Sequence, residues 1–258
     1  MRRRGYPAKA IRTFCEKIGV SKAYSVVSMD LLESCVRDEL NENAPRAMAV
    51  LDPLKVVIDN YPEGKTEEIE VEVHPNHPEM GTRKVLFGRE LFVEREDFMA
   101  EPVKKYFRLF PGSEVRFKSA YFVKCVGFDC DENGEVTTVH CTYDPESRGG
   151  NSPDGRKVKG TIHWVSAEGS FKATVNMYDR LFNVPNPSDE STGSFKDNLN
   201  PDSLKVLTGC LIESGLKDVK PGDVFQFMRK GYFCVDKNST CDNIIFNLTV
   251  PLNSSWGK

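Results

Sequence analysis

The stretch EIEVEV, residues 68–73, predicts the fold class of this chain. Its apolar side chains, Ile69, Val71 and Val73, alternate with glutamates. Successive side chains of a β-strand point to opposite faces, so this period of two indicates a strand with one buried face and one acidic face. The same period recurs along most of the chain after residue 45. We expect further strands at 85–93, 114–124, 136–143, 157–165, 171–178, 204–212, 224–234 and 243–250.

Turn-forming residue pairs separate these expected strands. The pairs are Pro111-Gly112, Asn133-Gly134, Asp154-Gly155 and Pro221-Gly222. Many short strands with few helices between them are typical of barrels or sandwiches, and they argue against a parallel α/β fold. The polar stretch 183–203 is predicted to be a long surface loop.

The helical period is confined to the first forty or so residues. Pro7 suits a first helical position, and apolar residues from Ile11 to Ile18 recur at spacings of three and four before Gly19. Ser28 can cap a second helix, because its hydroxyl can accept a hydrogen bond from a backbone N–H of the first turn. The sequence therefore predicts a short α-helical segment followed by a mainly β chain.

The bulk composition describes a globular chain of 258 residues with a net charge of −3. No apolar run approaches the roughly 20 residues that a membrane-spanning helix needs, and we expect no membrane partner. The N-terminus MRRRGYPAKAIR has the positive start of a signal peptide without its apolar core, so we expect a cytoplasmic protein. The eight cysteines are scattered, without a CxxC pair, and are predicted to be reduced thiols.

A basic, aromatic-rich strip, VKKYFRLFPGSEVRFKSAYFVK, covers residues 103–124. It holds six basic residues and one acidic residue in a chain that is acidic on average. Its first part, within DFMAEPVKKYFRL, predicts a short helix with Val103 and Phe107 on the packed side and the basic residues on the solvent side. After Pro111-Gly112 we expect a strand on which Arg116 and Lys118 share one face.

Two interpretations of this strip remain open from its residues alone. It is either a solvated charged face with aromatic side chains in the core, or a nucleic-acid surface. Clustered cations release counterions from phosphate, and an arginine can read a guanine edge through two hydrogen bonds. A second basic face, formed by Lys157, Lys159 and His163 of an expected strand, allows the same two interpretations.

Two motifs resemble metal-binding sites but are better explained as ordinary structural elements. The stretch DCDENG, residues 129–134, begins like a calcium loop, but His140 stands where the closing glutamate should be, so a hairpin turn is the better interpretation. His74 and His77 are separated by prolines and have no third ligand nearby, so we expect no metal. The chain has no GxxxxGK[ST], GxGxxG or GxSxG motif, which favours a binding module.

Longer motifs resemble a known family. NENAPRAMAVLDPLKVVIDNY (41–61), HPNHPEMG (74–81), DGRKVKGTIHWVSA (154–167), YDRLFNVPNP (178–187) and FQFMRKGYFCVD (225–236) resemble the C-terminal, anticodon-binding region of bacterial glutaminyl-tRNA synthetases. The resemblance covers essentially the whole chain, in order. Glutamyl enzymes of eukaryotic type share this architecture and remain an alternative, as does a stand-alone RNA-binding barrel protein.

The resemblance implies two antiparallel, ribosomal-protein-like β-barrels, one inserted in the other. Residues 1–45 would end a helical connecting subdomain. Residues 46–97 and 165–258 would form the first, proximal barrel, and residues 98–164 the second, distal barrel. The catalytic half of the family, which uses ATP and Mg, is absent from this chain, so we expect a fragment without catalytic residues, cofactor or metal. We expect the fragment to be a monomer that binds tRNA.

The resemblance also implies which residues contact RNA. They are Asn41, Arg46, Asn76, Lys105, Arg108, Arg116, Lys118, Gln226 and Arg229. Arg46 matches an arginine in the pocket of the middle anticodon base, a uridine, and Gln226 and Arg229 match its partners there. Asn41 matches a residue at the anticodon loop.

The remaining matched positions lie at the outer anticodon bases. Asn76 and Arg108 match residues close to the third base, a guanine, Arg116 matches a residue at the first base, and Lys118 matches a phosphate contact. The sequence departs from the family pattern at three of its positions, where Lys105 replaces a glutamine, Phe107 a lysine and Lys118 an arginine. A lysine at 118 keeps the charge and loses the planar fork of arginine, which favours a phosphate over a base.

Overall fold

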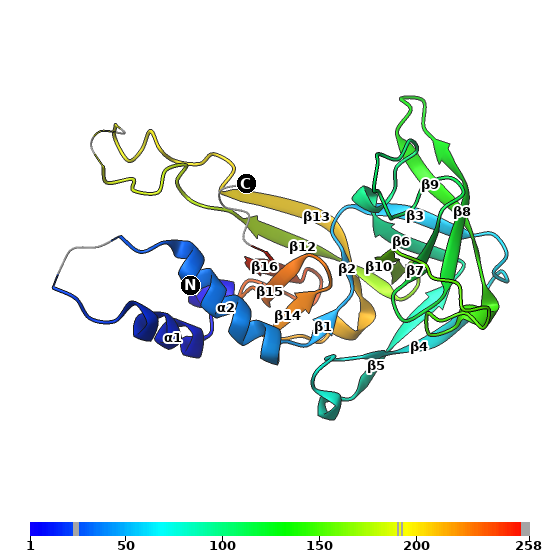
Figure 1. Ribbon diagram of the computed structural model, residues 1–258, viewed down its shortest axis with the longest axis horizontal. Coiled ribbons are helices and arrows are strands. Elements are labelled where there is room, and N and C mark those ends of the chain that lie inside the picture. Colours follow the sequence, from blue (N-terminus) through cyan, green and yellow to red (C-terminus); the bar gives the residue numbers. More distant parts are fainter. Residues whose placement is uncertain (23–25, 190, 192, 254–258) are drawn as a thin grey trace. The chain divides into compact units, whose positions relative to one another are not determined.

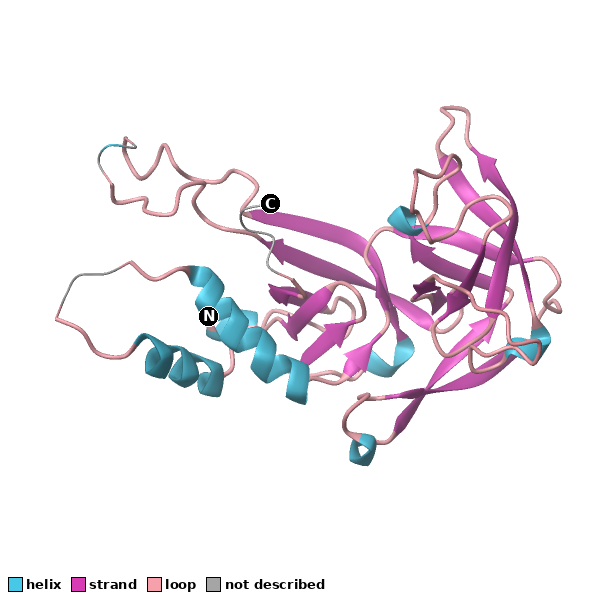
Figure 2. Ribbon diagram, viewed as in Figure 1, coloured by secondary structure: helices cyan, strands magenta, loops and turns pink. Residues whose placement is uncertain are grey.

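The computed structural model describes residues 1–22, 26–189, 191 and 193–253 (Figure 1). The helices in this part are the 3-10 turns η1 (Arg2–Arg4), η2 (Pro78–Met80), η3 (Arg95–Asp97), η4 (Pro145–Ser147) and η6 (Ser214–Leu216), and the α-helices α1 (Ala8–Ile18) and α2 (Met29–Asn43). The strands are β1 (Arg46–Ala47), β2 (Ala49–Val50), β3 (Pro53–Ile58), β4 (Thr66–Glu72), β5 (Thr82–Gly88), β6 (Glu90–Glu94), β7 (Glu114–Phe117), β8 (Phe122–Cys130), β9 (Val136–Tyr143), β10 (Thr161–Ile162), β11 (Val165–Ser166), β12 (Ser170–Tyr178), β13 (Leu204–Glu213), β14 (Val224–Phe227), β15 (Gly231–Val235) and β16 (Ile245–Pro251). The prediction of a mainly β chain preceded by a short helical segment is confirmed, as Figure 2 shows.

The chain divides into two compact units. Unit 1 consists of Met1–Arg46, Thr174–Thr208 and Val219–Lys258, and unit 2 consists of Ala47–Ala173 and Gly209–Asp218. Across the described residues, no helix is both long enough and apolar enough to cross a membrane. The polar stretch 183–203 is a loop over its described part, as predicted.

The cap of α2 and the end of α1 lie where the sequence predicts, whereas Pro7, expected as a first helical residue, lies directly before α1. The Ser28 hydroxyl accepts a hydrogen bond from the backbone N–H of Asp30 at 3.1 Å and so caps α2. Helix α1 follows Pro7 and ends at Gly19, whose φ of 65° lies in the left-handed region that glycine tolerates. Helix α1 packs against α2, and α2 packs on strand β16. Leu32 and its buried neighbours on α2 share one core cluster with residues of the strands β15 and β16.

The sheet of unit 1 is built around a hairpin. Strand β14 pairs with β15 and β15 with β16, both antiparallel, while β12 pairs parallel to β16. Phe227 and Phe233 stack with ring centres 4.4 Å apart, and Phe246 meets Phe227 edge-on at 5.0 Å. The long strand predicted at 224–234 is therefore two strands joined by a turn.

Unit 2 contains a seven-stranded sheet in the order β10-β7-β8-β9-β3-β6-β11 and a separate β4–β5 ribbon. The hairpin predicted at Asn133-Gly134 joins β8 to β9, and its Gly134 has a φ of 82°. His140 of β9 contacts Asp59 at 3.1 Å and Asp129 at 2.9 Å through its two ring nitrogens. These carboxylates raise the pKa of His140.

The core of unit 2 is aromatic. Trp164 is fully buried, lies 5.2 Å from Phe87 edge-on, and donates its indole N–H to the backbone oxygen of Lys118 at 3.1 Å. The strand predicted at 157–165 is reduced to β10 and β11. Strand β3 was not predicted.

The helix predicted within DFMAEPVKKYFRL, residues 97–109, is wrong, because residues 98–110 form a loop. Its two ends are tied together: Met99 donates a backbone hydrogen bond to Leu109 at 3.0 Å. Lys105 has a φ of 69°, which a right-handed helix does not allow, and Pro102 disfavours helical geometry in the residue before it. Val103 is exposed as a result, so the expected packed side does not exist.

Candidate nucleic-acid interface

Polar side chains of unit 1 form a hydrogen-bonded group around the end of α2. Arg46 donates from Nη2 to the backbone oxygen and Oδ1 of Asn41, at 2.8 and 3.0 Å, and from Nη1 to the backbone oxygen of Ala44 at 3.0 Å. The Tyr232 hydroxyl donates to Asn41 Oδ1 at 3.2 Å and accepts from Gln226 Nε2 at 2.8 Å. Three predicted site residues, Asn41, Arg46 and Gln226, are thus brought together.

This group is held by its backbone as well as by its side chains. Gln226 lies on β14 directly across from Tyr232 on β15, and its backbone N–H donates to Pro45 at 2.8 Å. Arg46 is only 6% exposed. Burial lowers the pKa of the Arg46 guanidinium, and burial raises the pKa of Tyr232 against the opposing effect of the Arg46 charge.

Tyr232 is a member of this group that was not predicted. The available signal was the hairpin itself, because a residue that faces Gln226 across two short antiparallel strands shares its side of the sheet. Arg229 lies in the turn of the same hairpin with a φ of 66°, and the backbone N–H of Lys230 donates to Phe227 at 3.0 Å. One hairpin therefore carries Gln226 on a strand and Arg229 in its turn.

In unit 2, the single strand predicted at 114–124 is two strands, β7 and β8, joined by a turn. Strand β7 has the predicted alternation of buried and half-buried residues. Val115 and Phe117 are buried, Arg116 is half-buried, and Lys118 just beyond the strand is exposed. The Arg116 guanidinium lies 5.3 Å from the centre of the Phe122 ring, and its buried Nε has no hydrogen-bond partner. The two cations thus differ: Arg116 is stacked on a ring, and Lys118 extends into solvent.

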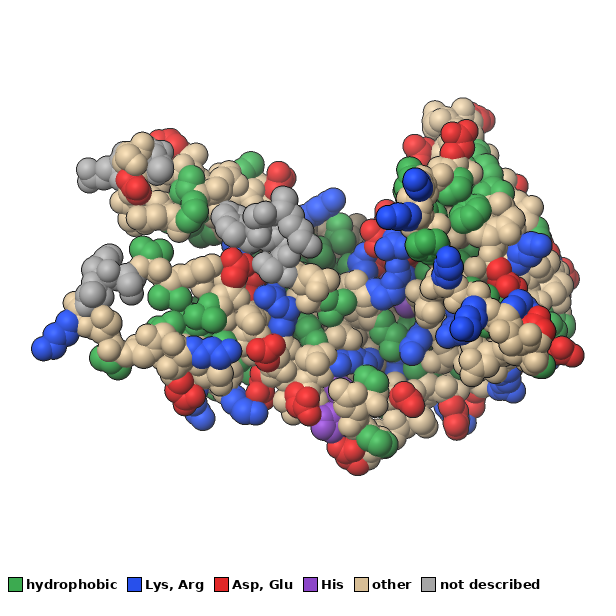
Figure 3. Space-filling model, viewed as in Figure 1, with side chains coloured by type: hydrophobic (Ala, Val, Ile, Leu, Met, Phe, Trp, Pro, Cys, Tyr) green, Lys and Arg blue, Asp and Glu red, His purple; other side chains and the backbone are tan. Residues whose placement is uncertain are grey.

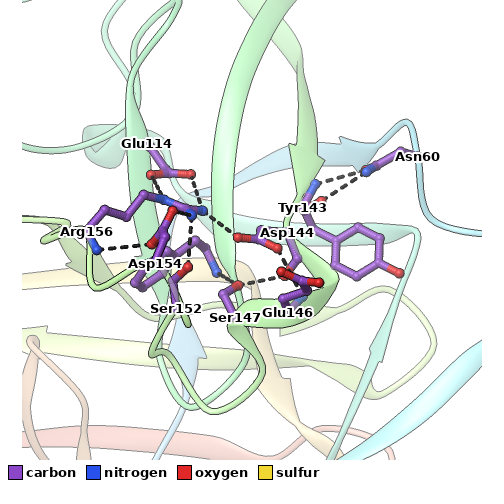
Figure 4. Close-up of polar contacts among 10 residues, drawn as sticks. Asn60, Glu114, Tyr143, Asp144, Glu146, Ser147, Ser152, Asp154 and Arg156 are labelled. Atoms are coloured by element: carbon purple, nitrogen blue, oxygen red, sulfur yellow. Dashed lines mark hydrogen bonds and ion pairs between the residues drawn. The ribbon is translucent and has the colours of Figure 1, made fainter.

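Arg156 also stacks on Phe122, at 5.1 Å from the ring centre, and it was not predicted. It donates to both carboxylate oxygens of Glu114 at 3.0 and 3.1 Å, to Asp144 at 2.5 Å and to Asp154 at 2.6 Å (Figure 4). Hydrogen bonds to these three carboxylates raise the pKa of Arg156. Asp154 is a local partner, but Glu114 and Asp144 come from other segments, so the local sequence does not mark this cluster.

Arg108 and Lys105 lie in the loop at 98–110. Arg108 Nη1 is 3.1 Å from Oδ1 of the fully buried Asp97 and 3.1 Å from the backbone oxygen of Glu96. Lys105 is exposed. The loop therefore holds the Arg108 fork at a defined position while it leaves Lys105 in solvent.

Asn76 is exposed in the connection between β4 and β5. Its backbone N–H donates to Nδ1 of the buried His74 at 3.2 Å, and the rings of His74 and His77 are 4.7 Å apart. Nowhere in the described ranges do three or more His, Cys, Asp or Glu side chains gather as metal ligands would.

The second predicted basic face is partly wrong. Lys157 and Lys159 are exposed, but His163 is 1% exposed and lies 3.5 Å from Oε1 of Glu94. His163 belongs to the core, because the chain turns between β10 and β11 and does not continue as one strand. On the face seen in Figure 3, Lys and Arg side chains are interspersed with acidic ones.

Two family models match the chain, and both carry the description "tRNA synthetases class I (E and Q), anti-codon binding domain". They cover residues 44–144 and 161–236. The chain belongs to this family.

The relatives include proteins named "Glutamine--tRNA ligase". The protein from Bradyrhizobium diazoefficiens is 52% identical over 258 residues, which cover 100% of this chain and 46% of the relative. The proteins from Vibrio parahaemolyticus and Clostridium perfringens are 51% and 53% identical, over 100% and 99% of this chain and 46% of each relative. The chain therefore spans about half the length of the curated relatives it matches.

Proposed function

We propose that this chain is the anticodon-recognition region of a glutamine–tRNA ligase and binds the anticodon stem-loop of glutamine-accepting tRNA. The observation that carries the proposal is the match of both halves of the chain to anticodon-binding domains, at residues 44–144 and 161–236. Those ranges contain Arg46, Asn76, Lys105, Arg108, Arg116, Lys118, Gln226 and Arg229. The name shared by the relatives supports glutamine over glutamate.

The geometry supports a division of roles among these residues. Arg46, with Asn41 and Gln226, reads the middle anticodon base, and Arg229 closes the pocket from the hairpin turn. Recognition of RNA sequence commonly uses unpaired bases that are splayed out and contacted at their edges by such fixed donors.

Residues of unit 2 contact the first and third anticodon bases. Arg108 and Asn76 read the third base, a guanine, and Arg116 reads the first base. Lys118 and Lys105 bind phosphates, because an exposed lysine is a mobile point charge without a planar fork.

The parent protein joins glutamine to tRNA with ATP and Mg, as a class I aminoacyl-tRNA synthetase of the cytoplasm, and this chain alone is an inactive monomer. Its residues 1–45 end a connecting subdomain, 46–97 with 165–258 form the proximal barrel, and 98–164 form the distal barrel. The chain should yield no glutaminyl-tRNA when incubated with ATP, glutamine and tRNA, and charging above a protein-free blank would contradict this assignment.

Titrations with labelled anticodon stem-loops test the binding function. One loop carries uridine and guanine at the middle and third anticodon positions, and a second replaces that guanine with cytosine. A base contact discriminates by roughly 1–3 kcal/mol, so the wild-type chain should prefer the first loop by roughly 5- to 150-fold. Arg108→Ala should remove most of this preference.

Lys118→Ala is the matched control in the same strip. It should weaken both loops equally and reduce the salt dependence of log K by about 0.7 in slope, the value for one phosphate contact with single-stranded RNA. A wild-type chain that binds both loops with equal affinity would contradict anticodon recognition. A preference for a glutamate anticodon would assign the chain to a glutamyl-type enzyme.

A further inference from the structure

Phe107 is an aromatic side chain that unit 2 exposes beside cations. It is 51% exposed, and among the described aromatic residues only Phe195, at 54%, is comparably open to solvent. A single exposed apolar side chain is ordinary on a protein surface, so exposure alone has no weight. What distinguishes Phe107 is the Lys159 ammonium, which lies 5.1 Å from the centre of its ring, within cation–π range.

The backbone that carries this ring is fixed. A Cβ added to Gly160 would lie 1.9 Å from the backbone oxygen of Phe107, so the two segments touch at a point where no side chain fits. The Gly160 backbone oxygen in turn accepts the backbone N–H of Arg116 on β7 at 2.8 Å. The loop is closed at its base by the hydrogen bond from Leu109 N–H to the Asp97 backbone oxygen at 2.9 Å. Phe107 is therefore presented by an anchored loop.

The surroundings of the ring are those of a single-stranded RNA contact. Lys104 and Lys105 are exposed just before it, and Arg108 follows it. Proteins that hold unpaired RNA combine exposed aromatic faces, on which bases stack, with cations that track the phosphates. The other cation-flanked phenylalanine of unit 2, Phe122, is 1% exposed and closed off by two arginines, so it offers no face to a base.

We propose that Phe107, with Lys159 at its ring, is a stacking platform for one unpaired base of the bound RNA. The inference rests on the proposed function and adds a contact at a position where the sequence departs from the family pattern. The base stacks on the ring. Lys159, whose ammonium lies 5.1 Å from the ring centre, and the exposed Lys105, two residues before Phe107, supply positive charge for the phosphates that flank this base. Because every base has a π-face, this contact selects an unpaired nucleotide and is tolerant of its identity.

Stem-loops with a single abasic nucleotide at each loop position in turn, titrated against the wild-type chain and Phe107→Ala, locate the stacked base. The comparison is needed because an abasic anticodon position also removes the edge contacts proposed above. The wild-type chain should lose roughly 5- to 150-fold in affinity at the stacked position, the range for one base–aromatic contact. Phe107→Ala should lose a similar factor with the intact loop and nothing further when that position is abasic. Phe107→Trp should retain affinity, and Phe107→Leu, which keeps bulk without a π-system, should resemble Phe107→Ala.

Phe195→Ala is the matched control, because it removes an equally exposed phenylalanine from the 183–203 loop, and it should leave binding unchanged. Wild-type affinity of Phe107→Ala for the intact loop, or equal losses at every abasic position, would overturn the platform. If the wild-type chain discriminates anticodons while Phe107→Ala is unaffected, only this inference fails. If the wild-type chain binds no stem-loop, the proposed function fails with it.

Discussion

Replacing Arg46 with lysine should destabilise unit 1 even though the charge is kept. The guanidinium donates to the backbone oxygens of Asn41 and Ala44, which belong to the last turn and the end of α2. Such carbonyls have no partner within a helix, so Arg46 completes the hydrogen bonding of the C-terminus of α2. Its positive charge also lies at the negative end of the helix dipole.

The size of the effect follows from the number of acceptors. A lysine ammonium at the end of a flexible stem can reach one of the two backbone oxygens and leaves the other without a donor. Asn41 Oδ1 still accepts a hydrogen bond from the Tyr232 hydroxyl, so losing the Arg46 donor costs less at this atom than at a backbone oxygen left without any donor. An unsatisfied buried acceptor costs about 1–3 kcal/mol, and Arg46 is buried, so we expect the free energy of unfolding to fall by about 2 kcal/mol.

Thermal and urea unfolding of the purified chain measure this loss. A change of about 2 kcal/mol should lower the unfolding temperature by roughly 4–8 °C. Arg12→Lys, on the exposed side of α1, is the control and should melt with the wild type. If Arg46→Lys also melts with the wild type while its affinity for the anticodon loop falls, the guanidinium serves RNA alone and its role at the helix end is refuted.

Two further predictions concern unit 2. The folded-state pKa of His140 is raised by its two aspartate partners, so its stabilisation is complete below the unfolded-state pKa of about 6.5 and is lost as the pH rises through the folded value. His140→Asn should therefore flatten the pH dependence of urea unfolding above about pH 6, and an unchanged profile would exclude this coupling. Gly160→Ala should lower the free energy of unfolding by about 1–3 kcal/mol, because the added methyl group collides with the Phe107 backbone. Gly127→Ala is the control, because a methyl group at that position meets open space, and its stability should be unchanged. Equal melting temperatures of the two variants would contradict the close packing at Gly160.

Elements defined by local chemistry were predictable from the sequence. Ser28 caps α2 because a short hydroxyl next to an amphipathic run can satisfy a free N–H within its own turn. The Asn133-Gly134 turn and the strand 136–143 were predicted at their observed positions, since a glycine at positive φ and a period of two act over a few residues. The confirmed mainly β class follows from the same signals.

Elements decided by distant contacts were not predictable. The residues around Val103 have helical spacing, yet the hydrogen bonds between the ends of the 98–110 loop override it. His163 has the position of an outward residue in an unbroken strand, but the chain turns there and buries it beside Glu94. In both cases the local pattern was real, and the tertiary fold imposed a different geometry.

The candidate site shows the same distinction among its cations. Three of its four arginines are restrained by partners that the structure shows: Arg46 by backbone oxygens, Arg108 by the buried Asp97 and Arg116 by the Phe122 ring. A restrained guanidinium loses little further conformational entropy when it binds a base edge. Its donors lie in one plane at fixed angles, so it binds a base edge in a defined orientation.

Lys105 and Lys118 are exposed and extend into solvent. A flexible ammonium follows a phosphate wherever the RNA backbone passes, so it contributes affinity without selecting a sequence. Fixed arginines and mobile lysines are therefore the combination expected of a surface that selects a few bases while it attracts the backbone around them. Phe107 adds a third kind of contact, an anchored aromatic face that would hold a base in place without identifying it.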